Sequence, residues 1–201
     1  SRFRADSMYL KKCIEDGDLG EIYYARAQAI RRRAVPTWGV FLDAENQGGG
    51  PLIDIGTHAL DVTLYLMNNY KPKMVVGTKY KMVENADQGN PWGGWGPDEN
   101  TSLEDAAFGF IVMENGATIV LEASWALNYA DAREAVTTIC GTKAGADMND
   151  GLRINGVRNG CQYVLKPNLG AGGVAFYDGN GNEAPEVREA RQWIDAVIND
   201  K

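Results

Sequence analysis

The chain has 201 residues, 44% of them hydrophobic, and a formal net charge of −7 at pH 7. This is enough apolar material for one sizeable core, so we expect a single domain over residues 1–201. The acidic balance argues against nucleic acid as a partner, because neutralising phosphates requires clustered Lys and Arg, and the only dense basic run is residues 31–33. No apolar run reaches the roughly 18 residues of a membrane span. The three widely spaced cysteines fit reduced thiols in a cytoplasmic protein.

The first third of the chain is expected to hold two helices and one strand. Apolar residues recur at helical spacing in residues 5–16, whereas residues 22–30 alternate with period two, as a strand does. An irregular loop over residues 36–46 leads to a triglycine at 48–50 and a helix over 51–68. Because the chain begins with Ser and ends just after another expected helix, we expect it to be a piece of a longer polypeptide.

Strands dominate the remainder of the chain. Residues 103–113 and 117–127 form a hairpin pair, and Asn115-Gly116 between them is a two-residue turn signal. The fold class is therefore α+β, with an open, mostly antiparallel β-sheet and helices packed on one face. The other expected elements are strands over 74–83, 136–140, 152–154 and 161–165, and an amphipathic helix containing Val187, Ala190, Ile194 and Val197.

The long segment 85–100 interrupts these strands. It holds Trp92 and Trp95 among glycines and prolines. A loop of this length inside a compact domain is often functional, and we expect it to lie over a binding face or a partner.

One constellation suggests chemistry. His58 is the only histidine, and Asp54 lies four residues earlier on the expected helix, so both side chains are expected on one face, which Asp61 extends. An imidazole oriented by a carboxylate can accept a hydroxyl proton at neutral pH, as oxidation of a secondary alcohol requires. Taken alone, the spacing favours an idle helical ion pair. The triglycine shifts the balance, because it lets another backbone, a cofactor or a substrate approach closely.

Several segments resemble one family. G-G-G-P-L-I-D-I-G-T-H-A-L-D at 48–61 is similar to the signature of the glucose-fructose oxidoreductase/inositol dehydrogenase/MocA family, and G-D-L-G-E-I at 17–22 is similar to its entry into the first strand of the second domain. E-N-G-A at 114–117 and C-G-T-K-A-G at 140–145 match its hairpin and following strand. The resemblance covers nearly the whole chain and is most specific between residues 17 and 61.

The resemblance implies a two-domain enzyme of which this chain is the C-terminal domain. The N-terminal Rossmann domain, which binds NAD or NADP, is absent from this chain, as is the family's E-K-P lysine. His58 is implied as the acid/base and Asp54 as a substrate-hydroxyl or proton-relay ligand. The open sheet face is implied to carry a homo-oligomer interface.

Four further residues are candidates for substrate contacts. Arg33 and Trp38 lie in the segment that reaches the active-site cleft in family members, and Asn128 and Tyr129 follow the exit of the hairpin. The alternatives are a surface arginine and a tryptophan that anchors its loop.

We expect neither a cofactor-phosphate site nor a metal site in this chain. Residues 170–175 spell G-x-G-x-x-A, but no strand precedes them and no helix opens after them. Asp178, Asn180, Asn182 and Glu189 have the spacing of a calcium loop, yet Glu183 stands where glycine makes its turn. A single histidine with scattered cysteines supplies no zinc set.

The expected function is hydride transfer between a sugar- or polyol-like alcohol and a nicotinamide, with this chain alone inactive. Two alternatives stay open: an NAD-dependent glycosidase of the same family, and a non-catalytic oligomerisation module. The sequence leaves the substrate and the choice between NAD and NADP undetermined.

Overall fold

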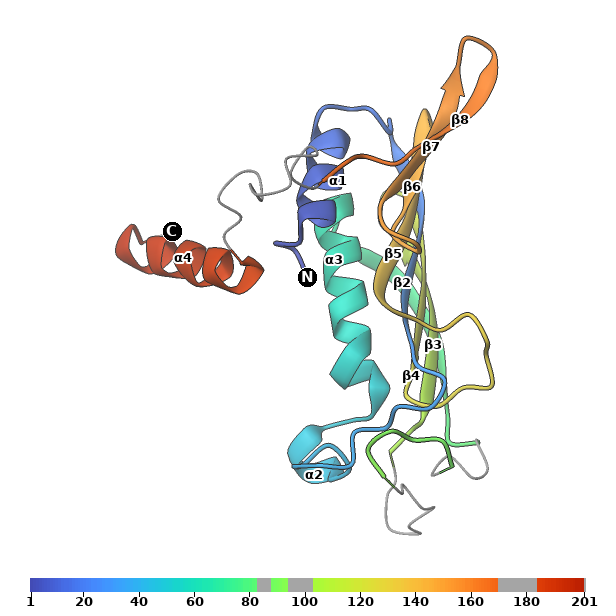
Figure 1. Cartoon of the computed structure of the whole chain (residues 1–201), viewed down its shortest axis with the longest axis vertical. Coiled ribbons are helices and arrows are strands. Elements are labelled where there is room, and N and C mark those ends of the chain that lie inside the picture. Colours follow the sequence, from blue (N-terminus) through green and yellow to red (C-terminus); the bar gives the residue numbers. More distant parts are fainter. Residues whose placement is uncertain (83–87, 94–102, 170–183, 201) are drawn as a thin grey trace, which may run out of the picture.

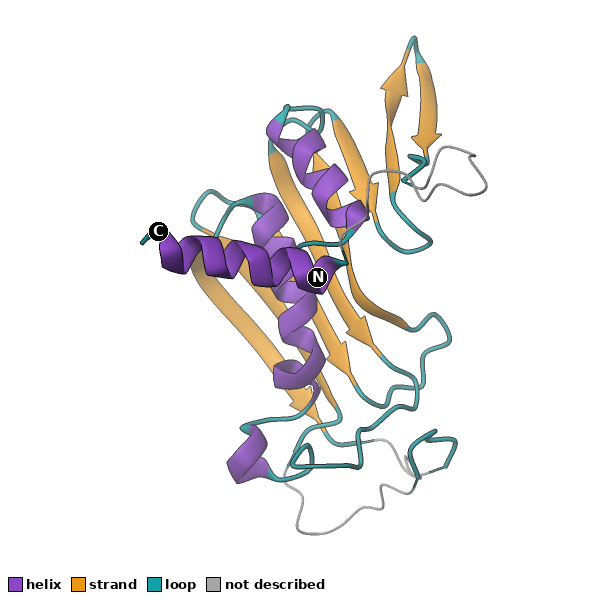
Figure 2. Cartoon of the chain, turned by 60° about the vertical axis from the view of Figure 1, so that its left-hand side comes forward, coloured by secondary structure: helices purple, strands orange, loops and turns teal. Residues whose placement is uncertain are grey.

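The computed structural model describes residues 1–82, 88–93, 103–169 and 184–200. The G-x-G-x-x-A segment, most of the calcium-like spacing and Trp95 lie outside these residues. The described strands form one sheet in the order β2-β3-β4-β1-β5-β6-β7-β8 (Figure 2). Their bounds are β1 Ile22–Ile30, β2 Pro72–Tyr80, β3 Ala106–Met113, β4 Thr118–Ser124, β5 Arg133–Gly141, β6 Ala144–Asp147, β7 Arg153–Arg158 and β8 Cys161–Leu165.

The sheet is open and mostly antiparallel, which confirms the expected fold class. Among the described strands, only β1 and β4 pair in parallel, with Ile30 opposite Ser124. The helices are α1 (Ala5–Glu15), α2 (Ala44–Gln47), the π-helical turn η1 (Leu52–Gly56), α3 (Thr57–Met67) and α4 (Pro185–Ile198). Helices α1 and α3 lie on one side of the sheet, and the opposite face carries no described helix (Figure 1). No described helix is long and apolar enough to cross a membrane.

The core lies between α3 and the centre of the sheet. On β1, Ala25, Ala27 and Ala29 are fully buried, and their small side chains leave room for Val62 and Leu66 of α3. The period-two alternation of the strand thus gives β1 a face of small residues against which the apolar side of the helix packs. This packing fixes α3 across the sheet.

The hairpin between β3 and β4 differs from the expected two-residue turn. The amide of Met113 donates to the carbonyl of Ala117, and three residues lie between them. Gly116 has a φ of +87°, whereas Asn115 stays outside the left-handed region. A two-residue type I′ turn needs positive φ at both central residues, so the chain forms a three-residue loop with Gly at the left-handed position.

Two short elements escaped the sequence prediction. Strand β6 has four residues, too few for alternation to show, and helix α2 lies at the end of the expected irregular loop. Asp43 caps α2, because its carboxylate accepts hydrogen bonds from the amides of Glu45 and Asn46.

The triglycine allows the close approach of a neighbouring backbone. Gly48 ends α2 with a φ of +84°, and the amide of Gly50 donates to Oε1 of the buried Glu104 at 2.9 Å. A Cβ added to Gly50 would stand 2.3 Å from the carbonyl oxygen of Glu104. Residue 50 therefore has to be glycine for the segment that leads into η1 and α3 to pack on the residues just before β3.

We predict that Gly50→Ala lowers the free energy of unfolding by about 1–3 kcal/mol, because rigid backbone atoms must shift to admit the methyl group. Urea unfolding measures the loss. Gly109→Ala in β3 is the matched control, since its added Cβ meets its nearest atom at an ordinary 3.6 Å. Equal stabilities of the two variants would contradict this account of Gly50.

Candidate active site

The parallel pairing of β1 and β4 brings distant residues to one end of the sheet. Arg31 follows the last residue of β1, and Trp125 follows the last residue of β4. Strand β5 runs antiparallel to β1, so Glu134 near its start reaches the same end. Open sheets with crossover helices commonly bind ligands outside the carboxyl ends of their strands. The candidate site lies at this end.

Asp54 of η1 is the centre of a charged network here. The indole Nε1 of Trp125 donates to Asp54 Oδ2 at 2.7 Å, and Arg31 Nη1 lies 3.8 Å from the same oxygen. Arg31 in turn donates through Nε and Nη2 to both carboxylate oxygens of Glu134, at 2.7 and 2.6 Å. Within the described residues, Asp54 Oδ1 accepts no hydrogen bond. One oxygen of this carboxylate is therefore held by the protein, and the other is available to a ligand hydroxyl.

Arg31 stays cationic in this network. Its partial burial opposes the charge, but the hydrogen bonds and charge of Glu134, together with the charge of Asp54, raise the pKa of Arg31 above its ordinary value. A fixed cation thus stands between two carboxylates, and the fully buried Trp125 adds a neutral donor. The network orients Asp54 in a single way.

His58 does not share this network, and the expected pairing of its imidazole with Asp54 is not seen. The backbone over Leu52–Gly56 is π-helical, and the Oδ2 atom of Asp54 accepts the indole N–H of Trp125. Within the described residues, no hydrogen bond or ion pair joins Asp54 to His58. The exposed His58 instead stands in the first turn of α3.

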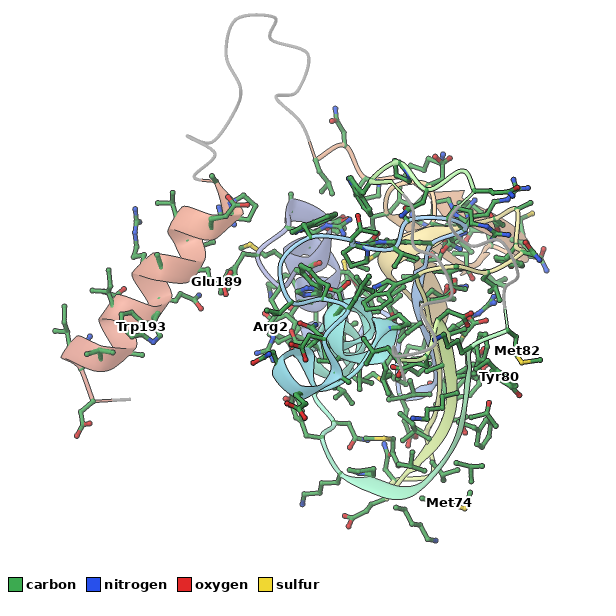
Figure 3. All side chains as sticks on the ribbon, turned by 90° about the horizontal axis from the view of Figure 1, so that it is seen from below. Arg2, Met74, Tyr80, Met82, Glu189 and Trp193 are labelled. Carbon is green, nitrogen blue, oxygen red and sulfur yellow. The ribbon has the colours of Figure 1, made fainter. Side chains whose placement is uncertain are left out.

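His58 lines a cleft of about 560 Å³ on the helix side of the molecule. Asp61, expected on the same stripe, also lines this cleft and accepts a hydrogen bond from Arg2 Nε at 2.8 Å. Glu189 of α4 closes the opposite side, facing Arg2 (Figure 3). The imidazole is therefore reachable from solvent and from whatever occupies this cleft.

The other predicted substrate residues divide between two places. Arg33 Nη2 donates to Asn128 Oδ1 at 2.6 Å, so these two candidates are brought together beside the network. Trp38 is half exposed on the loop after β1. Tyr129 instead contacts Arg26, whose pKa is raised chiefly by its hydrogen bond to Glu122, and this cluster lies on the open face of the sheet.

Three residues of this network are not evident from the sequence: Trp125 and Arg31 contact Asp54, and Glu134 holds Arg31. In the sequence, Arg31 stands out only as part of a basic run, and Trp125 and Glu134 are not among the candidate site residues. Their signal is the parallel register of β1 and β4, which strand alternation alone does not reveal. Among the described residues, no group of three or more His, Cys, Asp or Glu is arranged to hold a metal ion.

Comparison with known proteins identifies the family. The model of the GFO/IDH/MocA C-terminal domain matches residues 7–147, and the chain belongs to this family. The chain is also similar to the D-glucoside 3-dehydrogenase of Escherichia coli K12, with 41% identity over 147 residues that make up 73% of this chain and 42% of that protein.

Solved structures share the fold at lower identity. Levoglucosan dehydrogenase superposes with a TM-score of 0.75 at 20% identity, covering 98% of this chain and 56% of that one. The aldose-aldose oxidoreductase of Caulobacter crescentus superposes with a TM-score of 0.68 at 18% identity, covering 100% of this chain and 52% of that one. The chain therefore spans about half the length of the proteins it matches.

We predict that Trp125→Phe lowers the free energy of unfolding by about 1.5–3 kcal/mol, because a hydrogen bond to a carboxylate is lost from a buried position. Urea unfolding measures this. Asp54→Asn keeps an acceptor for the indole and removes only the charge, so it should lower the free energy of unfolding by less. A Trp125→Phe variant as stable as the wild type would show that the bond to Asp54 contributes nothing.

Proposed function

We propose that this chain is the substrate-binding and catalytic-residue domain of a NAD(P)-dependent sugar or polyol dehydrogenase. The observation that carries the proposal is the carboxylate of Asp54, fixed through Oδ2 and open at Oδ1, one turn before an accessible His58. Membership of the family and the likeness to D-glucoside 3-dehydrogenase support a sugar-like alcohol as substrate. The three free cysteine thiols support a cytoplasmic location.

In the proposed reaction, Asp54 Oδ1 accepts a hydrogen bond from a substrate hydroxyl and fixes the ring. His58 takes the proton of the hydroxyl that is oxidised, while the hydrogen on the same carbon leaves as hydride and a carbonyl forms. When bound, the nicotinamide accepts that hydride. Arg33 and Asn128 are proposed contacts for other sugar hydroxyls, and Trp38 for an apolar face of the substrate outside the oxidised ring. A lysine outside this chain completes the set.

The triglycine does not fit the phosphates of the cofactor. The amide of Gly50, the candidate donor before a helix, already donates to the buried carboxylate of Glu104, and a phosphate there would meet that negative charge. We therefore propose that NAD or NADP is held mainly by a preceding Rossmann domain. The 201-residue chain alone is expected to be inactive.

We also propose that the parent enzyme is a homo-oligomer through the open sheet face. Alternation places Met74, Val76, Tyr80 and Phe110 on this face, and these four residues, here called the open-face patch, are 45–58% exposed. The side chain of Tyr80 lies next to that of Met82, and Met74 lies toward the other end of β2 (Figure 3). A contiguous apolar patch of this kind marks an interaction surface, and burial against a second copy would remove it from water.

In the full-length protein, we predict that His58→Ala lowers kcat by about 10²–10⁴-fold, the usual contribution of a positioned acid/base. NADH formation with a glucoside substrate is the measurement. Thr57→Ala changes the neighbouring exposed residue of the same cleft and should keep most of the turnover. Retention of most turnover by His58→Ala would remove His58 from the mechanism. Release of free sugar without net NADH would indicate a glycosidase instead.

We predict that Phe110→Asp dissociates the oligomer, because it places a charge within the open-face patch. Light scattering on the full-length protein gives the mass. Val75→Asp is the matched control: Val75 is 62% exposed on the adjacent strand but pairs with Ile111 on the helix side. Loss of the oligomer in both variants, or in neither, would place the interface elsewhere.

A further inference from the structure

Two exposed tryptophans pack together at the same end of the sheet as Asp54. Trp38 follows β1, and Trp92 comes from the described segment 88–93 of the long loop. Their ring centroids are 4.8 Å apart with the planes at 80°, and the edge of Phe41 meets Trp38 at 5.6 Å. Trp38 is 50% exposed and Trp92 is 44% exposed. A large aromatic area therefore faces water at the candidate site, where aromatic side chains commonly line a ligand pocket.

Side-chain hydrogen bonds hold this pair in place. Asn90 Nδ2 donates to the carbonyls of Val35 and Gly93 at 3.1 and 2.8 Å, and its Oδ1 accepts from the amide of Val35 at 3.1 Å. The hydroxyl of Thr37 donates to the carbonyl of Trp92 at 2.6 Å. The two loops are thus tied to each other on both sides of the indoles. A ligand would meet an aromatic surface that is already formed, which reduces the entropic cost of binding.

Arg31 links the tryptophan pair to Asp54. Its guanidinium carbon lies 5.7 Å from the centroid of the Trp92 ring, and its Nη1 lies 3.8 Å from Asp54 Oδ2. The indole of Trp92 is therefore one side chain away from the carboxylate proposed to hold the reacting sugar. A ring attached to that sugar through a glycosidic oxygen would span the width of the Arg31 side chain and reach the indoles.

We propose that Trp92 and Trp38 form an aromatic subsite for the aglycone ring of a glycoside whose sugar ring is oxidised beside Asp54. This inference rests on the proposed function and narrows its substrate class to glycosides with a ring in the aglycone. Such a ring presents an apolar face, either of an arene or of the C–H groups of a second pyranose, which packs on an indole face. A simple sugar or a methyl glycoside has no group to reach the pair.

The test compares phenyl and methyl glucosides, each as the α and β anomer, with the full-length protein and saturating NAD. For the phenyl anomer that the enzyme oxidises, we expect Trp92→Ala to reduce kcat/KM about tenfold, since a stacking contact is lost. The reduction should come from a higher KM. The kcat/KM for the methyl glucoside should change less than twofold in the same variant. Trp92→Phe retains a ring face and should recover most of the preference for phenyl over methyl glucoside. This recovery would show that the effect of Trp92→Ala is not a folding defect. An equal loss for both glucosides, or no loss for either, would overturn the subsite.

Tyr23→Ala is the control for removing an exposed aromatic residue. Tyr23 is 55% exposed near the opposite end of β1, and its loss should leave the ratio of phenyl to methyl kcat/KM unchanged. A similar fall in that ratio for Tyr23→Ala would count against a specific role of Trp92.

Calorimetric binding to the NADH-loaded protein separates this inference from the proposed function. Tighter binding of the phenyl glucoside, abolished in Trp92→Ala, supports the subsite even if the wild type oxidises neither sugar, in which case only the dehydrogenase proposal fails. Equal binding of phenyl and methyl glucosides to an active wild type overturns the subsite alone. It would indicate that another part of the protein or a second copy covers the indoles.

Discussion

The parallel pairing of β1 with β4 is the constraint on which the site depends. A parallel connection requires a crossover, and the chain uses α3 for it, so the helix has to begin at the carboxyl end of β1. The π-helical turn before α3 therefore lies beside the residues that follow both strands. Arg31 and Trp125 reach Asp54 for this reason alone. An antiparallel β1–β4 pair would have sent the two side chains to opposite ends of the sheet.

Arg31 partly neutralises the two carboxylates at this end and contacts several neighbours at once. It satisfies Glu134 with two hydrogen bonds, lies close to Asp54 and faces the ring of Trp92. A partly buried arginine is stable only when such partners compensate for lost hydration. Its planar, permanently charged group suits this role better than a lysine, because it presents several donors and a flat face together. The same residue thus fixes the carboxylate and borders the aromatic surface.

Much of the fold was predictable from the sequence, because strand alternation and helical spacing are local. Residues 22–30 and 161–165 were predicted with the bounds that the structure has. The incorrect predictions concern local backbone geometry and long-range contacts, which the sequence pattern does not specify. The motif around Asp54 and His58 reads the same on an α-helix and on a π-helical turn, so the sequence does not reveal that Asp54 is bonded to Trp125 and not to His58. The bond from Trp125 to Asp54 joins residues 71 positions apart, and no local pattern announces it.

The absence of a direct bond between Asp54 and His58 among the described residues supports the catalytic proposal. In an idle ion pair, each group would have satisfied the other, and neither would have been available to a ligand. Here Asp54 is oriented by Trp125 and Arg31, whereas the imidazole of His58 has no hydrogen-bond partner among the described residues. Both of its nitrogens remain available for proton exchange in an open cleft. Under the proposed function, a carboxylate held by the sheet and an unengaged imidazole on the helix would act on the substrate from two directions, as is required to fix one hydroxyl while another is deprotonated.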